Sequence, residues 1–266
     1  MADLKMAVIG KDVSGSLSPV MHKFIMGKLG FNVEYDKVSI DPENFEKEFP
    51  KVYAEYDTLN VTIPYKLDVI PYMSELKEDA VVMKSVNTID CRTKFGYNTD
   101  GVGFMLMIEN AGVTANGKTV LVLGTGGVGR TVIKKLVTSG ATVSAFDLNQ
   151  DGLKELHEDF PKFTPLTTIE NKHYDIIINC TGVGMHKSVG KSPVSEDLLK
   201  LCDAAVDLIY VPAESEFLRL ARINGKKTVN GEAMLFYQAY YADCLFLGRK
   251  SSNDEAKVLF EEYRNL

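Results

Sequence analysis

The segment KTVLVLGTGGVGR (118–130) constrains the possible fold more than any other part of the chain. Residues 118–124 have the pattern of a continuous apolar strand, of the kind that is buried on both faces of a parallel sheet. Three glycines at G-x-G-x-x-G spacing, Gly124, Gly126 and Gly129, follow this strand and open a predicted helix at about 127–139. This strand–loop–helix context is typical of a dinucleotide-binding fingerprint, for which the alternative is a glycine-rich turn without a ligand.

Each glycine of this loop has a physical role in the predicted cofactor site. Gly124 would make the tight turn, Gly126 would let the backbone approach the pyrophosphate, and Gly129 would let helix and strand pack closely. Gly127 belongs to the same predicted loop, and the helix that begins there offers free N–H groups to the phosphates. Arg130 opens that helix, where its charge opposes the helix dipole, so we expect it to contact a phosphate rather than serve only the fold.

Asp147 indicates which nicotinamide cofactor this loop would bind. In such a fold the acid that binds the ribose is expected about 20 residues beyond the first glycine, and Asp147 ends the predicted strand ATVSAFD (141–147) there. Its carboxylate can accept hydrogen bonds from the ribose hydroxyls and would repel a 2′-phosphate. Leu148 follows, where a phosphate-binding enzyme would need Arg. We therefore predict NAD, with NADP as the alternative; in the competing interpretation Asp147 only caps the following turn.

Strand and helix patterns alternate along the chain and predict a doubly wound α/β fold. A helix is expected with Ser18 as its N-cap, Pro19 at its first helical position and Gly30 just past its end. A second helix is expected to open at Asp41-Pro42, and the last helices at about 232–247 and 254–263. The predicted strands are 4–10, 33–40, 58–62, a hairpin of 86–89 with 94–97, then 118–124, 141–147, 175–179, 204–210 and 228–229.

Composition limits the class of protein. A chain of 266 residues predicts about two domains, and 45% hydrophobic with 25% charged residues is ordinary for a globular protein. No apolar run reaches the roughly 18 residues that cross a bilayer, and the first residues do not form a signal peptide. The net charge is −6 with no block of Lys or Arg, which disfavours nucleic acid as a partner. We expect a cytoplasmic protein with no membrane or nucleic-acid partner.

The cysteines and histidines predict neither a metal site nor a disulfide framework. Cys91, Cys180, Cys202 and Cys244 are scattered without a C-x-x-C pair, and the four histidines do not cluster. Free cysteine is often a buried packing residue, and we expect that role for all four.

Four polar phrases in the first half of the chain are not explained by packing: SGSLSP (14–19), NVTIPYK (60–66), SVNT (85–88) and GYNTDGVGF (96–104). They place hydroxyls, amides, one ammonium and one carboxylate at strand ends or in loops, where an open α/β sheet presents ligand-binding groups. This set suits a small, polyhydroxylated, anionic molecule, because each hydroxyl needs a directed partner and the anion needs donors. The side chains are those of Ser16, Ser18, Asn60, Thr62, Lys66, Asn87, Thr99 and Asp100.

With these phrases the sequence resembles the shikimate dehydrogenase family over nearly the whole chain. NVTIPYK matches the family's N-V-T-x-P-x-K, NTDG (98–101) its N-T-D-G, and GTGGVGR its G-x-G-G-x-x-R. DLIYVPAESEFL (207–218) is similar to its D-x-x-Y-x-P segment, and NGEAMLFYQ (230–238) to its G-x-x-M-L-x-x-Q. Five such motifs in the family's order make the resemblance specific.

The resemblance implies an N-terminal α/β substrate-binding and catalytic domain at 1–103, completed by C-terminal helices at about 236–266. A Rossmann-type NAD(P)-binding domain at 104–235 would lie between them in sequence, with a cleft between the two domains. Lys66 and Asp100 would be the catalytic pair. The implied substrate-binding residues are Ser16, Ser18, Asn60, Thr62, Lys66, Asn87, Asp100, Tyr210 and Gln238. The implied cofactor-binding residues are Gly124, Gly126, Gly127, Gly129, Arg130, Asp147, Thr181 and Gly231.

The residues themselves also bear on the roles that the resemblance implies for Tyr210, Gln238 and Lys66. Tyr210 ends a predicted strand and could be only a packed aromatic residue. Gln238 lies inside the apolar helix MLFYQAYYADCLFL, where a buried amide needs a partner, so we favour substrate contact. Lys66 would take the hydroxyl proton in oxidation and act as the acid in reduction, while Asp100 would hold its ammonium.

Two departures from the family pattern bear on specificity. Lys84-Ser85 stands where the family usually has Gly-Ala, and Gly15 where it usually has His. Asp147-Leu148-Asn149 replaces the Asn-Arg-Thr/Ser of the NADP-using members, which agrees with the electrostatic argument for NAD. An acid at this position is more similar to the quinate/shikimate branch of the family.

The expected function is reversible hydride transfer between NAD and shikimate/3-dehydroshikimate, in the shikimate pathway of aromatic amino acid biosynthesis. The first alternative is a quinate/shikimate dehydrogenase of quinate catabolism. A folate-linked methylene dehydrogenase is disfavoured by Gln238 and by the paired serines before Pro19. A nucleotide-sensing module without chemistry is disfavoured because Lys66 and Asp100 are both present. We expect a small-molecule substrate and a monomer or homodimer.

Overall fold

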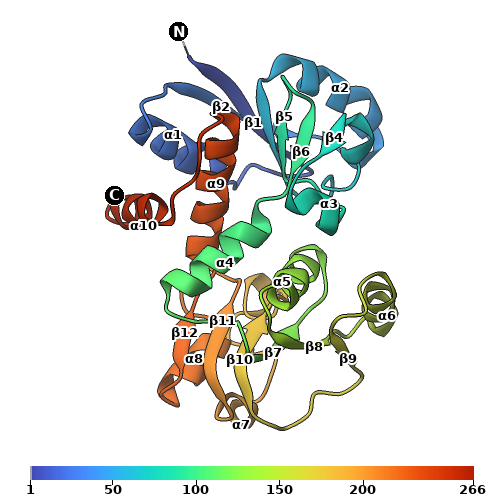
Figure 1. Cartoon of the computed structure of the whole chain (residues 1–266), viewed down its shortest axis with the longest axis vertical. Coiled ribbons are helices and arrows are strands. Elements are labelled where there is room, and N and C mark those ends of the chain that lie inside the picture. The colour runs from blue at the N-terminus through green and yellow to red at the C-terminus, as the bar shows by residue number, and fades with distance from the viewer. Residues whose placement is uncertain (1) are drawn as a thin grey trace. The chain divides into compact units, whose positions relative to one another are not determined.

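The computed structural model describes residues 2–266, which form two compact units (Figure 1). The first unit comprises the chain up to Gly103 together with Phe236–Leu266, and the second comprises Phe104–Leu235. The chain passes from the first unit to the second within helix α4 (Asp100–Asn110) and returns within helix α9 (Glu232–Phe246).

The first unit contains a mixed six-stranded sheet in the order β2-β1-β3-β5-β6-β4. Strand β1 pairs in parallel with β2 and β3, whereas β5 is antiparallel to both β3 and β6. The strands are β1 (Leu4–Gly10), β2 (Val33–Ser39), β3 (Thr58–Val61), β4 (Glu75–Leu76), β5 (Thr88–Asp90) and β6 (Phe95–Tyr97). Besides α4 and α9, the helices are α1 (Ser18–Lys28), α2 (Phe45–Glu55), α3 (Asp79–Met83) and α10 (Asn253–Arg264), with 3-10 turns η1 (Pro42–Asn44) and η2 (Ile70–Tyr72).

Strand β1 separates two apolar cores in this unit. Successive side chains of a strand point to opposite faces, so Met6 and Ala7 enter different clusters. Met6 packs in a cluster with Ala242 and Phe246 of α9, while Ala7 packs in a cluster with Phe49 of α2. Helix α9 thus completes one of the two cores of the N-terminal sheet.

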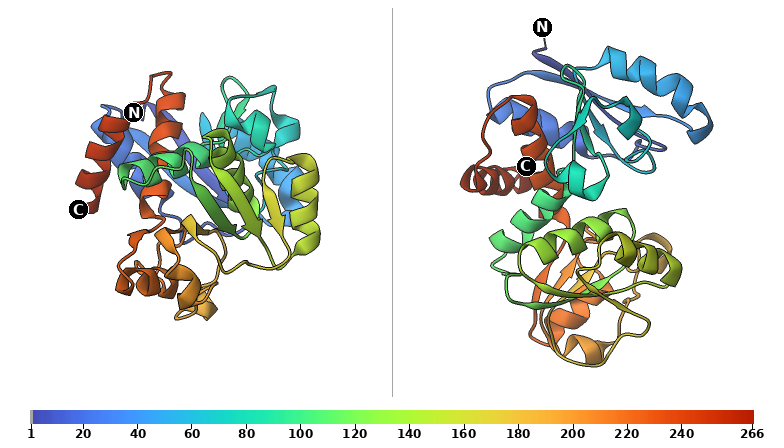
Figure 2. Two further views of the ribbon diagram at one scale, coloured as in Figure 1. Left: turned by 60° about the horizontal axis from the view of Figure 1, so that its bottom comes forward. Right: turned by 45° about the vertical axis from the view of Figure 1, so that its right-hand side comes forward.

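The second unit is a parallel sheet in the order β12-β11-β10-β7-β8-β9, with helices packed against it (Figure 2). If the six strands are numbered along the chain and the sheet is read from β9 to β12, the order is 3-2-1-4-5-6, which is the Rossmann order. The strand order reverses direction between β7 and β10. The strands are β7 (Thr119–Leu123), β8 (Thr142–Phe146), β9 (Thr164–Leu166), β10 (Tyr174–Asn179), β11 (Cys202–Asp207) and β12 (Lys227–Val229). The helices are α5 (Gly127–Thr138), α6 (Gln150–Asp159), α7 (Glu196–Leu199) and α8 (Glu216–Ile223), with the 3-10 turn η3 (His186–Ser188). The predicted α/β class and doubly wound sheet are confirmed.

The prediction that Ser18 caps helix α1 is wrong. The helix begins at Ser18 itself, its N-cap is Leu17, and no side chain caps it. The Ser18 hydroxyl instead accepts a hydrogen bond from the Ser16 hydroxyl at 3.1 Å. Because the helix begins at Ser18, Pro19 is its second residue, whereas the sequence predicted it as the first. Gly30 follows the helix with φ of +89°. The Ser18 hydroxyl therefore makes no capping hydrogen bond to the helix backbone.

Neither a membrane-spanning helix nor a cluster of metal-binding side chains is found among the described residues. Within residues 2–266, no helix is both long enough and apolar enough to cross a membrane. The same residues contain no group of three or more His, Cys, Asp or Glu side chains placed to hold a metal ion.

Candidate functional site

Lys66 and Asp100 form an ion pair in the first unit. Lys66 lies in the turn that follows β3, and Asp100 is the first residue of α4. The Lys66 Nζ lies 2.6 Å from Asp100 Oδ2, and the two side chains are 20% and 12% exposed. The pair is therefore largely shielded from water but still open to a small molecule.

An amide holds the Asp100 carboxylate in place. Asn87 Nδ2 donates to Asp100 Oδ1 at 2.9 Å, while Asn87 Oδ1 accepts from the Thr99 backbone N–H and from Thr88 Oγ1, both at 2.9 Å. These contacts fix which end of the Asn87 amide donates and which accepts. Asn98 Oδ1 also accepts from the Asp100 backbone N–H at 3.1 Å. Both oxygens of the carboxylate thus have a defined partner.

Gln238 of α9 joins the same group of side chains. Its Oε1 accepts from Thr99 Oγ1 at 3.2 Å and lies 3.4 Å from Asn87 Nδ2. The sequence predicted that this amide inside an apolar helix needs a partner, and the structure places it beside Asn87 and Thr99. Three separate segments therefore meet around Asp100: SVNT (85–88), NTDG (98–101) and helix α9.

Three further predicted substrate residues, Ser16, Ser18 and Asn60, lie in a second group with Tyr35, and Thr62 directly follows β3. Ser16 Oγ accepts from the Ser18 backbone N–H at 3.2 Å in addition to donating to the Ser18 hydroxyl. Tyr35 of β2 donates its phenol hydrogen to Asn60 Oδ1 at 2.7 Å. Asn60 Nδ2 is buried and has no hydrogen-bond partner among the described residues. Sequence reasoning missed Tyr35, since nothing in VEYDKVSI (33–40) distinguishes it from a core aromatic residue.

Lys84, which replaces the family's usual glycine, ends helix α3 in a left-handed conformation. Its φ and ψ are 49° and 44°, a region that glycine adopts at no steric cost. This conformation gives a physical reason for the glycine that the family usually has there.

The glycine loop of the second unit has the geometry that its sequence predicts. Gly124 has φ of +91°, and a Cβ on Gly129 would lie 2.1 Å from the Gly124 carbonyl oxygen, so helix α5 can start here only with glycine. A Cβ on Gly126 or Gly127 would meet no described atom within 4 Å. The backbone is thus exposed to open space at the start of α5, where N–H groups are available to an anion. These residues fit a dinucleotide pyrophosphate.

Asp147 is tied to this loop. Its Oδ2 accepts from the Thr125 backbone N–H at 2.6 Å and from Thr125 Oγ1 at 2.9 Å, and its Oδ1 accepts from the Asn149 backbone N–H at 2.8 Å. Burial would raise the pKa of Asp147, but the hydrogen bonds from Thr125 and Asn149 together lower it below its usual value. The carboxylate is therefore charged at neutral pH. One acceptor position on Oδ1 remains for a ribose hydroxyl.

Arg130 has structural partners in the same loop. Its Nε donates to the Thr125 carbonyl at 3.2 Å, and its Nη2 lies 3.4 Å from the Gly152 carbonyl of α6. The guanidinium therefore connects the loop to α6, the structural role that the sequence argument ranked below phosphate contact.

A buried acid organises the carboxyl ends of β10 and β11. Asp207 Oδ1 accepts from Asn179 Nδ2 and from the Ile209 backbone N–H, both at 3.0 Å, and Oδ2 accepts from Ser215 Oγ. Asn179 Oδ1 in turn accepts from the backbone N–H and hydroxyl of Thr181, at 3.0 and 2.6 Å. Burial raises the pKa of Asp207 to about 6. Sequence reasoning missed both Asp207 and Asn179.

Gly231 and Tyr210 have different surroundings in the second unit. A Cβ on Gly231 would lie 2.1 Å from the Leu208 carbonyl oxygen, so the close approach of two backbone segments requires glycine there. Tyr210 follows β11 and is 37% exposed, so it is not a core aromatic residue.

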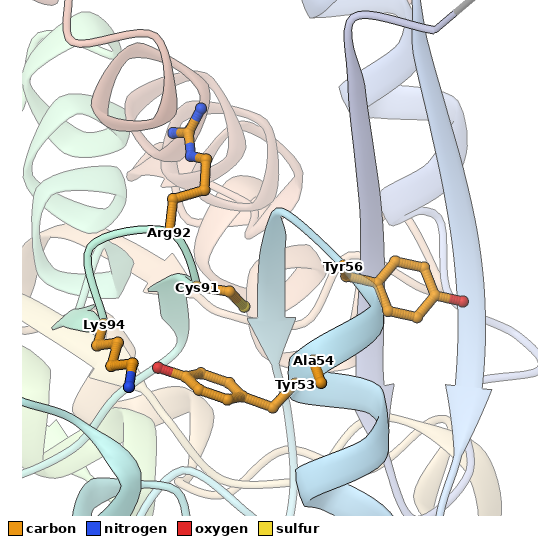
Figure 3. A pocket seen from close by; sticks show the side chains of 6 residues that line it. All are labelled: Tyr53, Ala54, Tyr56, Cys91, Arg92 and Lys94. Carbon is orange, nitrogen blue, oxygen red and sulfur yellow. The ribbon is translucent and has the colours of Figure 1, made fainter.

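A hollow of about 320 Å³ on the first unit lies apart from all predicted site residues (Figure 3). Figure 3 shows the Tyr53 ring of α2 directed toward Lys94 of the β5–β6 turn. Arg92 at its rim is already bound by Asp90 through Nε and Nη2, at 2.9 and 2.8 Å. We therefore keep the two groups around Asp100 and Tyr35 as the candidate substrate site.

Comparisons with known proteins point to one group of enzymes. Residues 8–89 match the model of the shikimate dehydrogenase substrate binding domain. The shikimate dehydrogenase (NADP(+)) of Caldanaerobacter subterraneus subsp. tengcongensis is 36% identical, with 93% of this chain and 92% of the relative covered. A chorismate mutase/shikimate 5-dehydrogenase fusion protein from Clostridium acetobutylicum is 31% identical with a TM-score of 0.90, covering 98% and 97%. The shikimate 5-dehydrogenase of Thermus thermophilus, solved with NADP(H) and shikimate, is 28% identical with a TM-score of 0.87, covering 97% and 99%.

Proposed function

Because this chain belongs to the shikimate dehydrogenase family, we propose that it is an oxidoreductase that interconverts shikimate and 3-dehydroshikimate. The observation that carries this proposal is the Lys66–Asp100 pair, held by Asn87 beside Gln238. A general acid/base is commonly oriented by a hydrogen bond from a neighbouring group, and Asp100 makes such a bond with Lys66. We place the reaction in the shikimate pathway of aromatic amino acid biosynthesis.

Lys66 moves the proton in the proposed mechanism. A bound nicotinamide supplies the acceptor or donor of the hydride. In the oxidative direction the neutral amine form of Lys66 accepts the proton of the substrate hydroxyl and becomes an ammonium, and in the reductive direction the ammonium form gives a proton to the carbonyl oxygen. Asp100 Oδ2 accepts a hydrogen bond from Nζ and keeps it directed at one position. Asn87 holds the other carboxylate oxygen, so Asp100 cannot rotate away from Lys66.

Ser16 and Ser18 would bind the substrate carboxylate. In the structure the two hydroxyls lie 3.1 Å apart, and neither caps helix α1. Two adjacent hydroxyl donors can turn toward the two oxygens of a carboxylate, since a hydroxyl hydrogen rotates freely. The other polar groups of the substrate have five further proposed partners: Asn60, Thr62, Asn87, Gln238 and Tyr210.

For the cofactor we propose that NAD is used in preference to NADP. Two of the relatives compared above, those of Caldanaerobacter subterraneus and Thermus thermophilus, are named or described with NADP, so this is a point on which the chain would differ from them. The proposal is supported by the charged Asp147 beside the glycine loop, with exposed Leu148 after it. A 2′-phosphate there would face the Asp147 carboxylate, and such a like-charge contact costs several kcal/mol.

The direct test offers shikimate and quinate separately, each with NAD and with NADP, and follows formation of the reduced nucleotide by absorbance. We expect oxidation of shikimate with NAD, at a higher kcat/KM than with NADP. Quinate is the second candidate substrate, because an acid at position 147 is similar to the quinate/shikimate branch. Absence of reaction in all four combinations would refute an enzymatic role and favour a nucleotide-binding protein without this chemistry.

A further inference from the structure

Tyr35 lies between two parts of the proposed substrate site, the serine loop with Ser16 and Ser18 and the end of β3 with Asn60. Its hydroxyl donates to Asn60 Oδ1 at 2.7 Å. Burial raises the pKa of Tyr35 well above its usual value and Asp243 raises it further, whereas a hydrogen bond with the Ser18 side chain lowers it. The phenol is therefore protonated and donates to Asn60. Because the Ser18 side chain lowers this pKa and also contacts Ser16, Tyr35 lies between the serine loop and the end of β3.

The Tyr35 ring stacks on a buried histidine whose other contact is a buried aspartate. The His22 imidazole of α1 stacks on the ring, with centroids 4.9 Å apart and planes inclined by 18°. His22 Nδ1 lies 2.6 Å from Asp243 Oδ1 of α9, and both side chains are fully buried. The histidine cannot shift without separating this pair in a low-dielectric core, so the phenol position is fixed.

The Asn60 amide shows what this fixed phenol achieves. An amide can rotate to exchange its oxygen and nitrogen, and only its hydrogen bonds decide which end faces a given direction. Tyr35 takes the oxygen, which leaves Nδ2 buried without a partner among the described residues. A buried donor without a partner costs free energy unless a ligand satisfies it. An acceptor oxygen of a bound molecule would satisfy this donor.

We propose that Tyr35 is a specificity-determining positioning residue, which fixes the Asn60 amide so that it presents its NH₂ group to an oxygen of the substrate. This inference rests on the proposed substrate site and adds to it a residue that no motif of the sequence indicated. The group recognised at this point is a hydrogen-bond acceptor, such as the oxygen of a ring hydroxyl or carboxylate. His22 and Asp243 act on substrate binding only through the position of the Tyr35 ring.

The test is a double-mutant cycle on shikimate kinetics with Tyr35→Phe, Asn60→Ala and the combined variant. Tyr35→Phe keeps the ring and its stacking on His22, so we expect KM for shikimate to rise roughly tenfold with kcat changed less than about twofold. In the Asn60→Ala background the same change should have almost no further effect, because the amide that Tyr35 orients is absent. Tyr56→Phe is the matched control, since its hydroxyl bonds to Asp36 instead.

Several results would overturn the inference. An unchanged KM in Tyr35→Phe, or an equal rise with and without Asn60, would leave Tyr35 as a packing residue. If Tyr35→Phe does not fold, Asn60→Asp provides the second test, because it keeps the acceptor for Tyr35 and removes the NH₂ donor. We expect Asn60→Asp to raise KM more than Asn60→Ala, and a normal KM would show that the amide presents its oxygen. A wild-type protein inactive on shikimate would refute the proposed function instead.

Discussion

Lys66 Nζ lies 2.6 Å from Asp100 Oδ2, although 34 positions separate the two residues in the chain. The pair joins the turn after β3 to the start of α4, and Asn87 at the start of β5 orients its carboxylate. This geometry supports the proposed role of Lys66 in proton transfer, because the hydrogen bond to Asp100 directs Nζ to one position.

We therefore expect Lys66→Ala to lower kcat for shikimate oxidation by roughly 10²–10⁴-fold with little change in KM, as for other acid/base groups. Steady-state kinetics at saturating nucleotide give both constants. Lys51→Ala, which removes an exposed lysine of α2, is the control and should leave both constants unchanged. A near-normal kcat with a raised KM would make Lys66 a binding residue.

Ser16→Ala should raise KM for shikimate by about one to two orders of magnitude, because a hydrogen bond to a charged group contributes roughly 1.5–3 kcal/mol. The carboxylate is remote from the reacting C–O bond, so kcat should change little. Ser14→Ala is the matched control, since this neighbouring hydroxyl donates to Asp12. If Ser16→Ala leaves KM unchanged, the carboxylate is bound elsewhere.

Ser18→Ala should also raise KM while leaving the melting temperature nearly unchanged. Loss of an N-cap costs about 1 kcal/mol, but Ser18 does not cap α1, so that cost is not expected. Thermal melts beside the kinetics separate the two effects. A large fall in melting temperature with unaltered KM would contradict the assignment of Ser18 to the substrate.

Local patterns predict much of this fold because they depend on nearby residues. The apolar run before Gly124 can be buried only as a strand, and Gly129 allows a contact that no larger residue permits. Strands β4 and β9, of two and three residues, are too short to show a period. They form because β6 and β8 lie beside them, which is a tertiary effect.

The candidate site was likewise predictable from local sequence only in part. Residue types and family motifs predict Lys66, Asp100 and Asn87 as site residues, but their mutual distances depend on the folded sheet. Ser18 precedes a proline at the start of a helix and has the pattern of an N-cap, yet the helix begins one residue earlier than that pattern requires. Tyr35 could not be predicted, since its role depends on Asn60, 25 positions away.

Asp207 should make stability depend on pH. Its pKa is raised from 3.8 to about 6 in the folded chain, so the folded state binds this proton more tightly than the unfolded state. The resulting stabilisation is complete below about pH 4 and is lost as the pH rises through about 6, a change of about 3 kcal/mol. An asparagine side chain does not titrate, so Asp207→Asn does not lose this stabilisation as the pH rises. The free energy of unfolding of the variant relative to wild type should therefore increase between about pH 4 and about pH 7. Urea unfolding of both proteins across this range checks the expectation; parallel pH profiles would contradict it.

Asp147 and Leu148 should together determine the choice of nucleotide. The carboxylate is charged and bound to Thr125, and Leu148 is 89% exposed, so an arginine introduced at 148 has room to reach a phosphate. Asp147→Asn removes the charge and keeps one oxygen for the Thr125 N–H. We expect the double variant Asp147→Asn/Leu148→Arg to shift the ratio of kcat/KM for NAD to that for NADP toward NADP by about 10²-fold or more, since a like-charge contact of several kcal/mol is replaced by an attractive one. Asp151→Asn, in the first turn of α6, is the control and should not move the ratio. If the wild-type protein already prefers NADP, or the double variant leaves the ratio unchanged, the Asp147 carboxylate serves only Thr125 and Asn149 and does not face the ribose.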